Sequence, residues 1–300
     1  MNKRQLALIA ATFVAFFYAA NFSVAKNVMP HYIKPFGFIM FRVTGAALLF
    51  WLVGVFGPKE TIQKKHYSRI FWGAFFGMAL NMLAFFYGLN LTTPINASVM
   101  MVTAPMITLV LTVIFLKEKL YWKRILGLLI GFSGTVLMIV YGKGDTITAP
   151  NPALGNLFVF INAAAYACYL VIVKKLTQIY HPFTFIKWMY LLGVFMVAPF
   201  GLTQVFEMPF SEIPVSGYLS IAYVVVFVTF GTYLLNIFAI KILKPTTVAV
   251  FIYFQPLLTT IIAILLGTDK VDFIKVIAAI LIFTGVFLVS QRPKETLKPN

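Results

Sequence analysis

The sequence predicts an all-α integral membrane protein, in which ten transmembrane helices form two five-helix repeats of opposite orientation. Its 300 residues are 61% hydrophobic and only 11% charged, whereas about 25% of the residues of a soluble domain are charged. The mean hydropathy is +0.93, and apolar runs of roughly 20 residues, long enough to cross a hydrocarbon core, recur along the chain. In addition, the closing segment of the first half recurs in the second half.

Ten apolar segments are separated by short connections that contain proline or glycine, which interrupt helices. None of these connections is long enough to hold a soluble domain. The predicted spans cover residues 6–26, 36–56, 70–90, 95–116, 124–141, 154–174, 183–204, 217–240, 246–267 and 273–290.

The amino terminus imitates a secretory signal peptide, because Lys3 and Arg4 precede an apolar run that ends in small residues. Two features argue against cleavage: the apolar stretch continues to Val24, and many further spans follow it. We therefore interpret this segment as an uncleaved first transmembrane helix.

The net charge of +16 would indicate nucleic-acid binding on a soluble surface, but here the positions of the charges decide its meaning. With the N-terminus inside the cell, seventeen of the 24 Lys and Arg residues fall on the inner side and five on the outer side. Cytoplasmic loops carry such an excess. We therefore expect a multi-pass protein of the inner (plasma) membrane, with both termini cytoplasmic, the lipid bilayer around it and no nucleic-acid partner.

An internal repeat relates the two halves. Pro105 and Gly134 recur as Pro256 and Gly285, at the same offset of 151 residues and without a gap between them. Because five spans are an odd number, the second copy must enter the membrane upside down, as in transporters that work by alternating access. The predicted units are residues 1–145 and 146–292, followed by a short cytoplasmic tail at 293–300.

The end of the first half has a helix with a proline at its middle, an acidic residue just past its end, and then a glycine-rich helix. These features are Pro105, Glu118 and residues 127–134, and Phe41-Arg42 in the second span also matches. In these residues the chain resembles the EamA-type family of the drug/metabolite transporter superfamily. The resemblance covers nearly the whole chain and implies a transporter of ten helices in two halves.

Pro105 and Pro256 each lie about ten residues into their helices. A proline lacks a backbone donor and clashes with the carbonyl four residues earlier, so the carbonyls of Met101 and Ile252 lose their partners. We expect a broken or kinked helix at mid-membrane. Its role is either a hinge or gate beside the substrate site or a static packing kink.

Polar and aromatic side chains within the spans are candidates for a substrate site, because each needs a partner in lipid. As a set they predict a central cavity with aromatic walls and a few amide groups, which suits a small amphipathic solute. For any one of them, hydrogen bonding between helices or core packing is the alternative role. The candidate substrate-binding residues are Tyr18, Asn21, Arg42, Asn81, Phe85, Thr103, Tyr166, Tyr169, Tyr233, Asn236, Tyr253 and Gln255.

Two cations lie inside predicted spans away from the span ends: Arg42, about six residues from one end of its span, and Lys187, at a similar depth in its own span. Both side chains are long enough to extend to the membrane interface, which is the default expectation. Arg42 has the stronger claim to a function, because it matches the family pattern and would attract an anionic group. All eight acidic residues fall in loops or at span ends, so no buried carboxylate relay of the kind found in pumps is predicted.

The sequence argues against an enzyme. The three histidines, His31, His66 and His181, lie in loops, and no nucleophile with a neighbouring base occurs at membrane depth. The single cysteine, Cys168, excludes an intramolecular disulfide and a cysteine metal site, and we interpret it as a packing residue. We expect no cofactor and no metal ion.

Glycines at helical spacing predict close helix contacts, because they let backbones approach. One pair is Gly73 and Gly77, and a second run is Gly127, Gly131 and Gly134. We expect the second run to lie between the fifth and tenth helices.

These observations favour a transporter that moves a small organic metabolite across the membrane by alternating access. An amino acid or a related amphipathic solute suits the predicted cavity, and efflux is implied only by the family resemblance. A passive facilitator and a channel are the alternatives, although no filter-like carbonyl loop or ring of charges is visible. The sequence is compatible with a monomer.

Overall fold

The computed structural model describes residues 2–26, 32–92, 94–141, 150–265, 267 and 270–291. Within these ranges the secondary structure is helical, without strands. Ten of its helical segments are long and apolar enough to span a membrane, and each overlaps one predicted span. The predicted all-α architecture with ten transmembrane helices is therefore confirmed.

In the described ranges, six of these spans are single helices. They are α1 (Lys3–Lys26), α2 (Pro35–Gly54), α7 (Trp122–Tyr141), α8 (Pro152–Thr177), α9 (Pro182–Phe206) and α14 (Phe273–Ser290).

The remaining spans are built from shorter pieces. The third span comprises the 3-10 turn η1 (Lys64–His66), α3 (Tyr67–Ala74), the π-helical η2 (Phe75–Ala79) and α4 (Leu80–Leu91); the fourth comprises α5 (Pro94–Met101) and α6 (Ala104–Leu116). The eighth comprises α10 (Val215–Tyr223), the π-helical η4 (Val224–Gly231) and α11 (Thr232–Ile242), preceded by η3 (Phe210–Glu212); the ninth comprises α12 (Pro245–Ala249), the 3-10 helix η5 (Val250–Tyr253) and α13 (Phe254–Leu265).

Several helices begin where the sequence supplies a start signal. Pro35, Pro152 and Pro182 are the first residues of α2, α8 and α9, a position where the missing N–H of proline costs nothing. Asn151 caps α8 by accepting a hydrogen bond from the backbone N–H of Leu154 at 3.2 Å. The prolines that interrupt the chain between spans therefore also define where the next helix starts.

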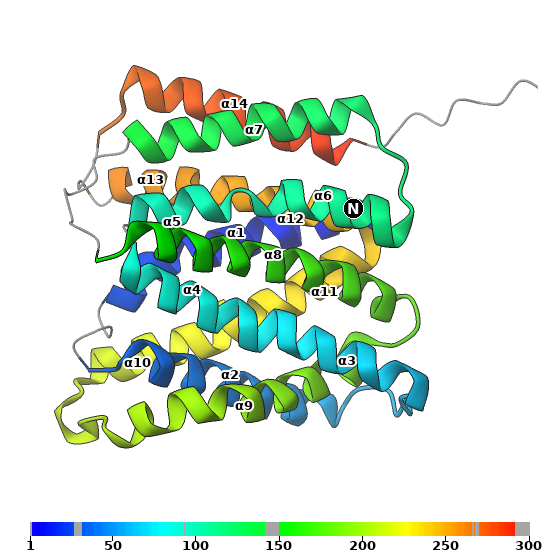
Figure 1. Ribbon diagram of the computed structural model, residues 1–300, viewed down its shortest axis with the longest axis vertical. Helices are drawn as coiled ribbons and strands as arrows, with labels where there is room; N and C mark the ends of the chain where they lie inside the picture. Colours follow the sequence, from blue (N-terminus) through cyan, green and yellow to red (C-terminus); the bar gives the residue numbers. More distant parts are fainter. Residues whose placement is uncertain are drawn as a thin grey trace, which may run out of the picture.

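Figure 1 shows the helices stacked in layers along the long axis of the molecule. The α7–α14 pair forms one outer layer, the α2–α9 pair forms the other, and the remaining spans lie between them. The members of each outer pair hold the same place in the two halves of the sequence, and the colours show that they run in opposite directions. In the middle layer α4 packs on α8 and α1 packs on α11.

The contact between α7 and α14 depends on glycine. A Cβ atom on Gly285 would lie only 2.5 Å from the backbone of Gly131, and a Cβ atom on Gly134 would lie 2.6 Å from Leu281. Real Cβ contacts are essentially never shorter than 3.0 Å, so larger residues would force these helices apart. The predicted contact between the fifth and tenth helices is confirmed.

Replacement of Gly285 by Ala is expected to destabilise the protein by about 1–3 kcal/mol, as overpacking of a close contact does. The physical reason is that the added methyl group meets backbone atoms, which cannot rotate away. Thermal unfolding in detergent micelles measures the effect. Gly54→Ala is the matched control, since its nearest neighbour is the flexible Lys187 side chain at 3.4 Å. An equal melting temperature for the two variants would contradict this account.

Candidate functional site

A cavity lies in the middle layer, between the two outer helix pairs. Its walls come from α1, α2, α4, α8 and α11, and from the two broken spans α5–α6 and α12–η5–α13. Its volume is about 130 Å³, comparable to the ~150 Å³ of an engineered cavity that holds benzene. A small organic solute therefore fits it.

Nine of the twelve candidate substrate-binding residues line this cavity. Their positions in the sequence are far apart, and the tertiary structure brings them together from six spans. The nine residues are Tyr18, Asn21, Arg42, Asn81, Phe85, Tyr166, Tyr233, Asn236 and Gln255. Whether they bind a substrate stays a prediction.

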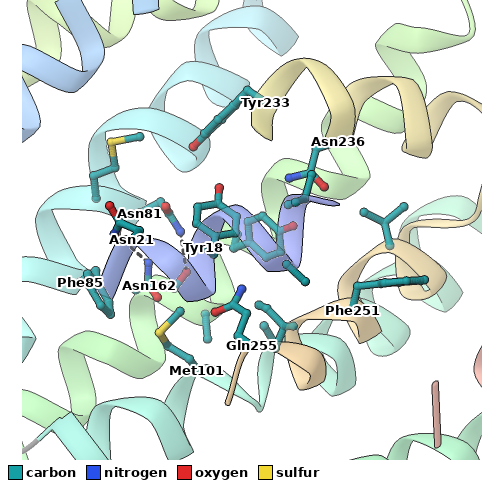
Figure 2. Close-up of a pocket in the computed structure, with 18 of the residues that line it drawn as sticks. Tyr18, Asn21, Asn81, Phe85, Met101, Asn162, Tyr233, Asn236, Phe251 and Gln255 are labelled. Atoms are coloured by element: carbon teal, nitrogen blue, oxygen red, sulfur yellow. Dashed lines mark hydrogen bonds between the residues drawn. The ribbon is translucent and has the colours of Figure 1, made fainter. Parts of the chain in front are cut away.

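Three asparagines gather on one side of the cavity (Figure 2). The side-chain amide of Asn81 donates to the Asn162 carbonyl at 3.2 Å, and the amide of Asn162 donates to the Asn81 carbonyl at 2.8 Å. This reciprocal pair joins α4 to α8. The Oδ1 atom of Asn21 is buried and has no hydrogen-bond partner among the described residues, so it offers an acceptor to a ligand.

Asn162 was missed among the candidates predicted from the sequence. It lies within the sixth span and is 6% exposed. The rule that selected the other amides, a polar side chain inside an apolar span, applies equally to this residue. Its signal was therefore present in the sequence.

Further polar groups face one another across the cavity (Figure 2). Tyr18 and Gln255 lie near its centre, and Tyr233 and Asn236 lie on the side away from the asparagine pair. The Tyr233 hydroxyl donates to the Gly77 carbonyl at 2.7 Å, which fixes its ring. Asn236 lies within hydrogen-bonding reach of the Tyr166 hydroxyl on α8, whereas the Gln255 amide lines the cavity without a hydrogen bond to a described residue and is available to a ligand.

The rest of the lining is apolar. It combines aromatic rings with flexible methionines, which adapt to irregular shapes. The larger of these side chains are Met82, Phe85, Phe86, Met101, Phe251 and Ile252.

Arg42 departs from the expectation that its side chain reaches the membrane interface. It is 7% exposed and lines the cavity, and its Nε donates to the Thr229 hydroxyl at 3.1 Å. The physical reason is that the π-helical segment η4 presents Thr229 opposite α2, so a polar partner is closer than the interface. Lys187, in contrast, lies over the Trp51 ring at 5.0 Å, outside the cavity.

Three candidates lie outside the cavity lining. Tyr169 is fully buried with its ring against Gly77, and Tyr253 is fully buried with its ring against Gly131. Both rings fill the space that a glycine leaves on a neighbouring helix, which is a packing role. The Thr103 hydroxyl donates to the Met100 carbonyl at 2.6 Å, within its own span.

The helices that contain Pro105 and Pro256 are interrupted as predicted. The fourth span breaks between Met101 and Ala104, just before Pro105. The ninth span passes through the 3-10 helix η5 just before Pro256. Met101 and Ile252, whose carbonyls the prolines deprive of a donor, line the cavity. A role for the two breaks as hinges stays a prediction.

Within the described part of the chain, no group of three His, Cys, Asp or Glu side chains is placed to hold a metal ion. The described residues that line the cavity include neither histidine, cysteine nor carboxylate. Its chemistry is that of amides, phenols, one guanidinium and apolar groups, which bind solutes by hydrogen bonds, charge and contact.

The model of the EamA-like transporter family matches the chain twice, over residues 5–140 and 153–291. The chain belongs to the EamA-like transporter family. The two matches divide the protein between the fifth and sixth spans, and together they include all residues of the cavity.

Relatives of this EamA-like protein are themselves named as transporters. One is the "uncharacterized transporter YyaM" of Bacillus subtilis, 27% identical over 277 residues, which are 91% of this chain and 90% of the relative. An uncharacterized transporter of Archaeoglobus fulgidus is 25% identical over 97% of this chain and 99% of its own length. The S-adenosylmethionine uptake transporter of Rickettsia bellii is 28% identical over 51% of this chain and 52% of its own length.

A solved crystal structure shares the fold. It superposes with a TM-score of 0.78 and covers 95% of this chain and 96% of its own, at 17% sequence identity. The family and these names indicate a membrane transporter and not an enzyme.

Replacement of Asn162 by Ala is expected to destabilise this EamA-like protein by about 1–3 kcal/mol, because the Asn81 carbonyl loses a buried donor. Thermal unfolding in micelles measures the change. Asn90→Ala is the control, since Asn90 is an exposed amide on the same helix as Asn81. A loss no larger than that of the control would show that the reciprocal pair does not hold α4 to α8.

Proposed function

We propose that this EamA-like protein carries a small amphipathic organic solute across the membrane by alternating access. The observation that supports this most directly is the cavity inside the helix bundle, which is lined by both halves of the chain and flanked by a break in the fourth and in the ninth span. Substrate sites of inverted-repeat transporters lie at such broken helices. The antiparallel pairs α7–α14 and α2–α9 (Figure 1) support the inverted relation of the two halves.

The end of the bundle that we assign to the cytoplasm has the features of a closed gate. The ammonium group of Lys174 donates to the carbonyls of Ile240 and Leu243 at 2.8 and 2.9 Å, at the C-terminal end of α11. A cation is favourable there because of the helix dipole. This contact ties α8 to α11 below the cavity.

A second contact closes the same end. Glu118, at the end of the fourth span, pairs with Arg124 at 3.2 Å and with Lys244 at 3.1 Å. Arg124 begins the fifth span and Lys244 precedes the ninth, so the carboxylate joins elements of both halves. In alternating access these ion pairs would open when the cavity turns toward the cytoplasm.

A substrate class and a direction of transport complete the proposal. An amino acid or a related solute suits the size of the cavity and its mixture of amides and rings. Efflux is implied by the family resemblance, whereas one relative is named as an uptake transporter. The assays therefore measure flux in both directions.

A passive facilitator is the second candidate, and one observation favours it. In the part of the chain that the structure describes, the acidic residues lie between helices or at helix ends, and no carboxylate lines the cavity to bind a coupling proton or cation. An imposed pH gradient separates the two candidates, because only a coupled carrier accumulates solute against its own gradient.

Purified protein in liposomes is expected to give saturable flux of a preferred solute, which is accelerated by the same solute on the opposite side. Isotope uptake from a panel of amino acids and small organic acids measures it. Asn21→Ala and Tyr166→Ala are expected to weaken the apparent affinity by roughly tenfold, because each removes a polar contact of about 1 kcal/mol or more.

Tyr253→Phe is the matched control for these variants, since Tyr253 lies outside the cavity. Flux that rises linearly with solute concentration would indicate a channel. Unchanged affinity in both cavity variants would remove these residues from the substrate site.

Replacement of Lys174 by Met is expected to open the cytoplasmic end more often, because charge-assisted hydrogen bonds to α11 are lost. Val248 lines the cavity and is buried, so Val248→Cys in a Cys168→Ser background reports on opening. Labelling by a membrane-impermeant maleimide from the cytoplasmic side should increase about tenfold, as the loss of ~1.4 kcal/mol or more implies. Lys175→Met is the control, and equal labelling in both lysine variants would argue against the gate.

A further inference from the structure

Arg42 holds the positive charge of the cavity. Among the described residues that line the cavity it is the one charged side chain, and it is 7% exposed. An arginine keeps its proton in any protein environment. A fixed cation therefore lies in the space that we propose for the solute.

The protein does not neutralise this charge with a carboxylate. Arg42 forms no ion pair with a described residue, and its hydrogen bond from Nε to the Thr229 hydroxyl has a neutral acceptor. A guanidinium has five N–H donors, so four of them receive no partner from the described part of the chain.

Of the five acidic residues that the structure describes, four bind partners at the ends of spans, Asp272 among them through Lys275, and the fifth, Glu212, does not line the cavity. Glu118 and Glu207 pair with cations at the two ends of the bundle, and Glu60 accepts hydrogen bonds from the backbone N–H of His181 and from the Thr184 hydroxyl. Each of these contacts lies at the end of a span. They therefore do not neutralise Arg42, and its counter-charge has to come from a molecule in the cavity.

A buried cation without a counter-charge is unfavourable, and the cost falls when an anion enters and forms charge-assisted hydrogen bonds. The planar fork of arginine matches a carboxylate in two parallel hydrogen bonds. A cationic solute in the same cavity would meet like charge at short range. The cavity thus distinguishes solutes by their charge, in addition to their size.

We propose that the solute is an amphipathic organic anion whose carboxylate pairs with Arg42 while its apolar body contacts the aromatic and methionine lining. This inference rests on the proposed transport function and narrows it to a substrate class. The apolar part is small, because the cavity volume of about 130 Å³ leaves room for a group of about the size of one benzene ring.

Two sets of probes that differ in charge alone test the proposal. One set is 3-phenylpropanoate, 3-phenylpropanamide and 3-phenylpropylamine, and the other is 4-methylpentanoate, 4-methylpentanamide and 4-methylpentylamine. Thermal stabilisation of the purified protein in micelles gives the dissociation constant of each probe. The carboxylate is expected to bind roughly ten- to a hundredfold more tightly than the amide, as a hydrogen-bonded charge implies, and the amine most weakly.

Arg42→Gln is expected to abolish the preference for carboxylate over amide, and Arg42→Lys to retain part of it. Lys187→Gln is the matched control, since it removes a cation from inside another span without touching the cavity. Elution as a single species and an unchanged melting temperature without probe establish that each variant is folded. If Arg42→Gln does not fold, the proposal is tested by the preference for carboxylate over amide in the wild type and in Arg42→Lys.

Several outcomes overturn the proposal: equal binding of carboxylate and amide by the wild type, stabilisation by none of the probes, or an unchanged preference in Arg42→Gln. Flux measurements distinguish a failure of the anion proposal from a failure of the proposed transport function. Saturable flux of neutral solutes without a preference for carboxylates would refute the anion proposal and leave transport standing. Selective carboxylate binding without flux in liposomes would refute the transport function and leave the anion proposal standing.

Discussion

The backbone of a transmembrane segment has to satisfy its own hydrogen bonds, because hydrocarbon offers neither donors nor acceptors. Away from the span ends, the described helices depart from regular α-helix at η2, η4, η5 and the break between α5 and α6. Side chains supply what the backbone lacks there: the Thr103 hydroxyl binds the Met100 carbonyl at 2.6 Å, and Thr229 binds the Val224 carbonyl at 2.9 Å. These irregular segments lie on or next to helices that line the cavity, where protein groups surround the backbone in place of lipid.

The same constraint divides the molecule into regular and irregular parts. The outer pairs α7–α14 and α2–α9 consist of uninterrupted helices, and α7–α14 is held by a contact so close that Gly131 and Gly285 leave no room for a methyl group. The middle layer contains the interrupted spans. Packed cores switch between discrete arrangements and do not deform continuously, so we expect the interrupted spans to move against the outer pairs during transport.

The charges follow a corresponding division. Cations and carboxylates pair at the ends of the bundle, as Glu118 does with Arg124 and Lys244. In the proposed mechanism, opening of this end requires contacts that water can replace. Arg42 is different, because a single neutral hydroxyl holds its guanidinium inside the cavity. Electrostatics thus has two roles in the proposed mechanism: exchangeable pairs at the gate, and one fixed charge that selects the solute.

The sequence by itself determined the ten spans, the repeat, and most of the polar residues of the cavity, because apolar length and polar exceptions to it are local properties. Asn162 is also a polar side chain inside an apolar span, so the same rule would have selected it. Only the tertiary structure decided that Tyr169 and Tyr253 fill the space beside Gly77 and Gly131, and that Arg42 faces Thr229. The direction of a side chain depends on how neighbouring helices are rotated and on where a π-helical turn shifts their register, and these follow from packing among all the spans.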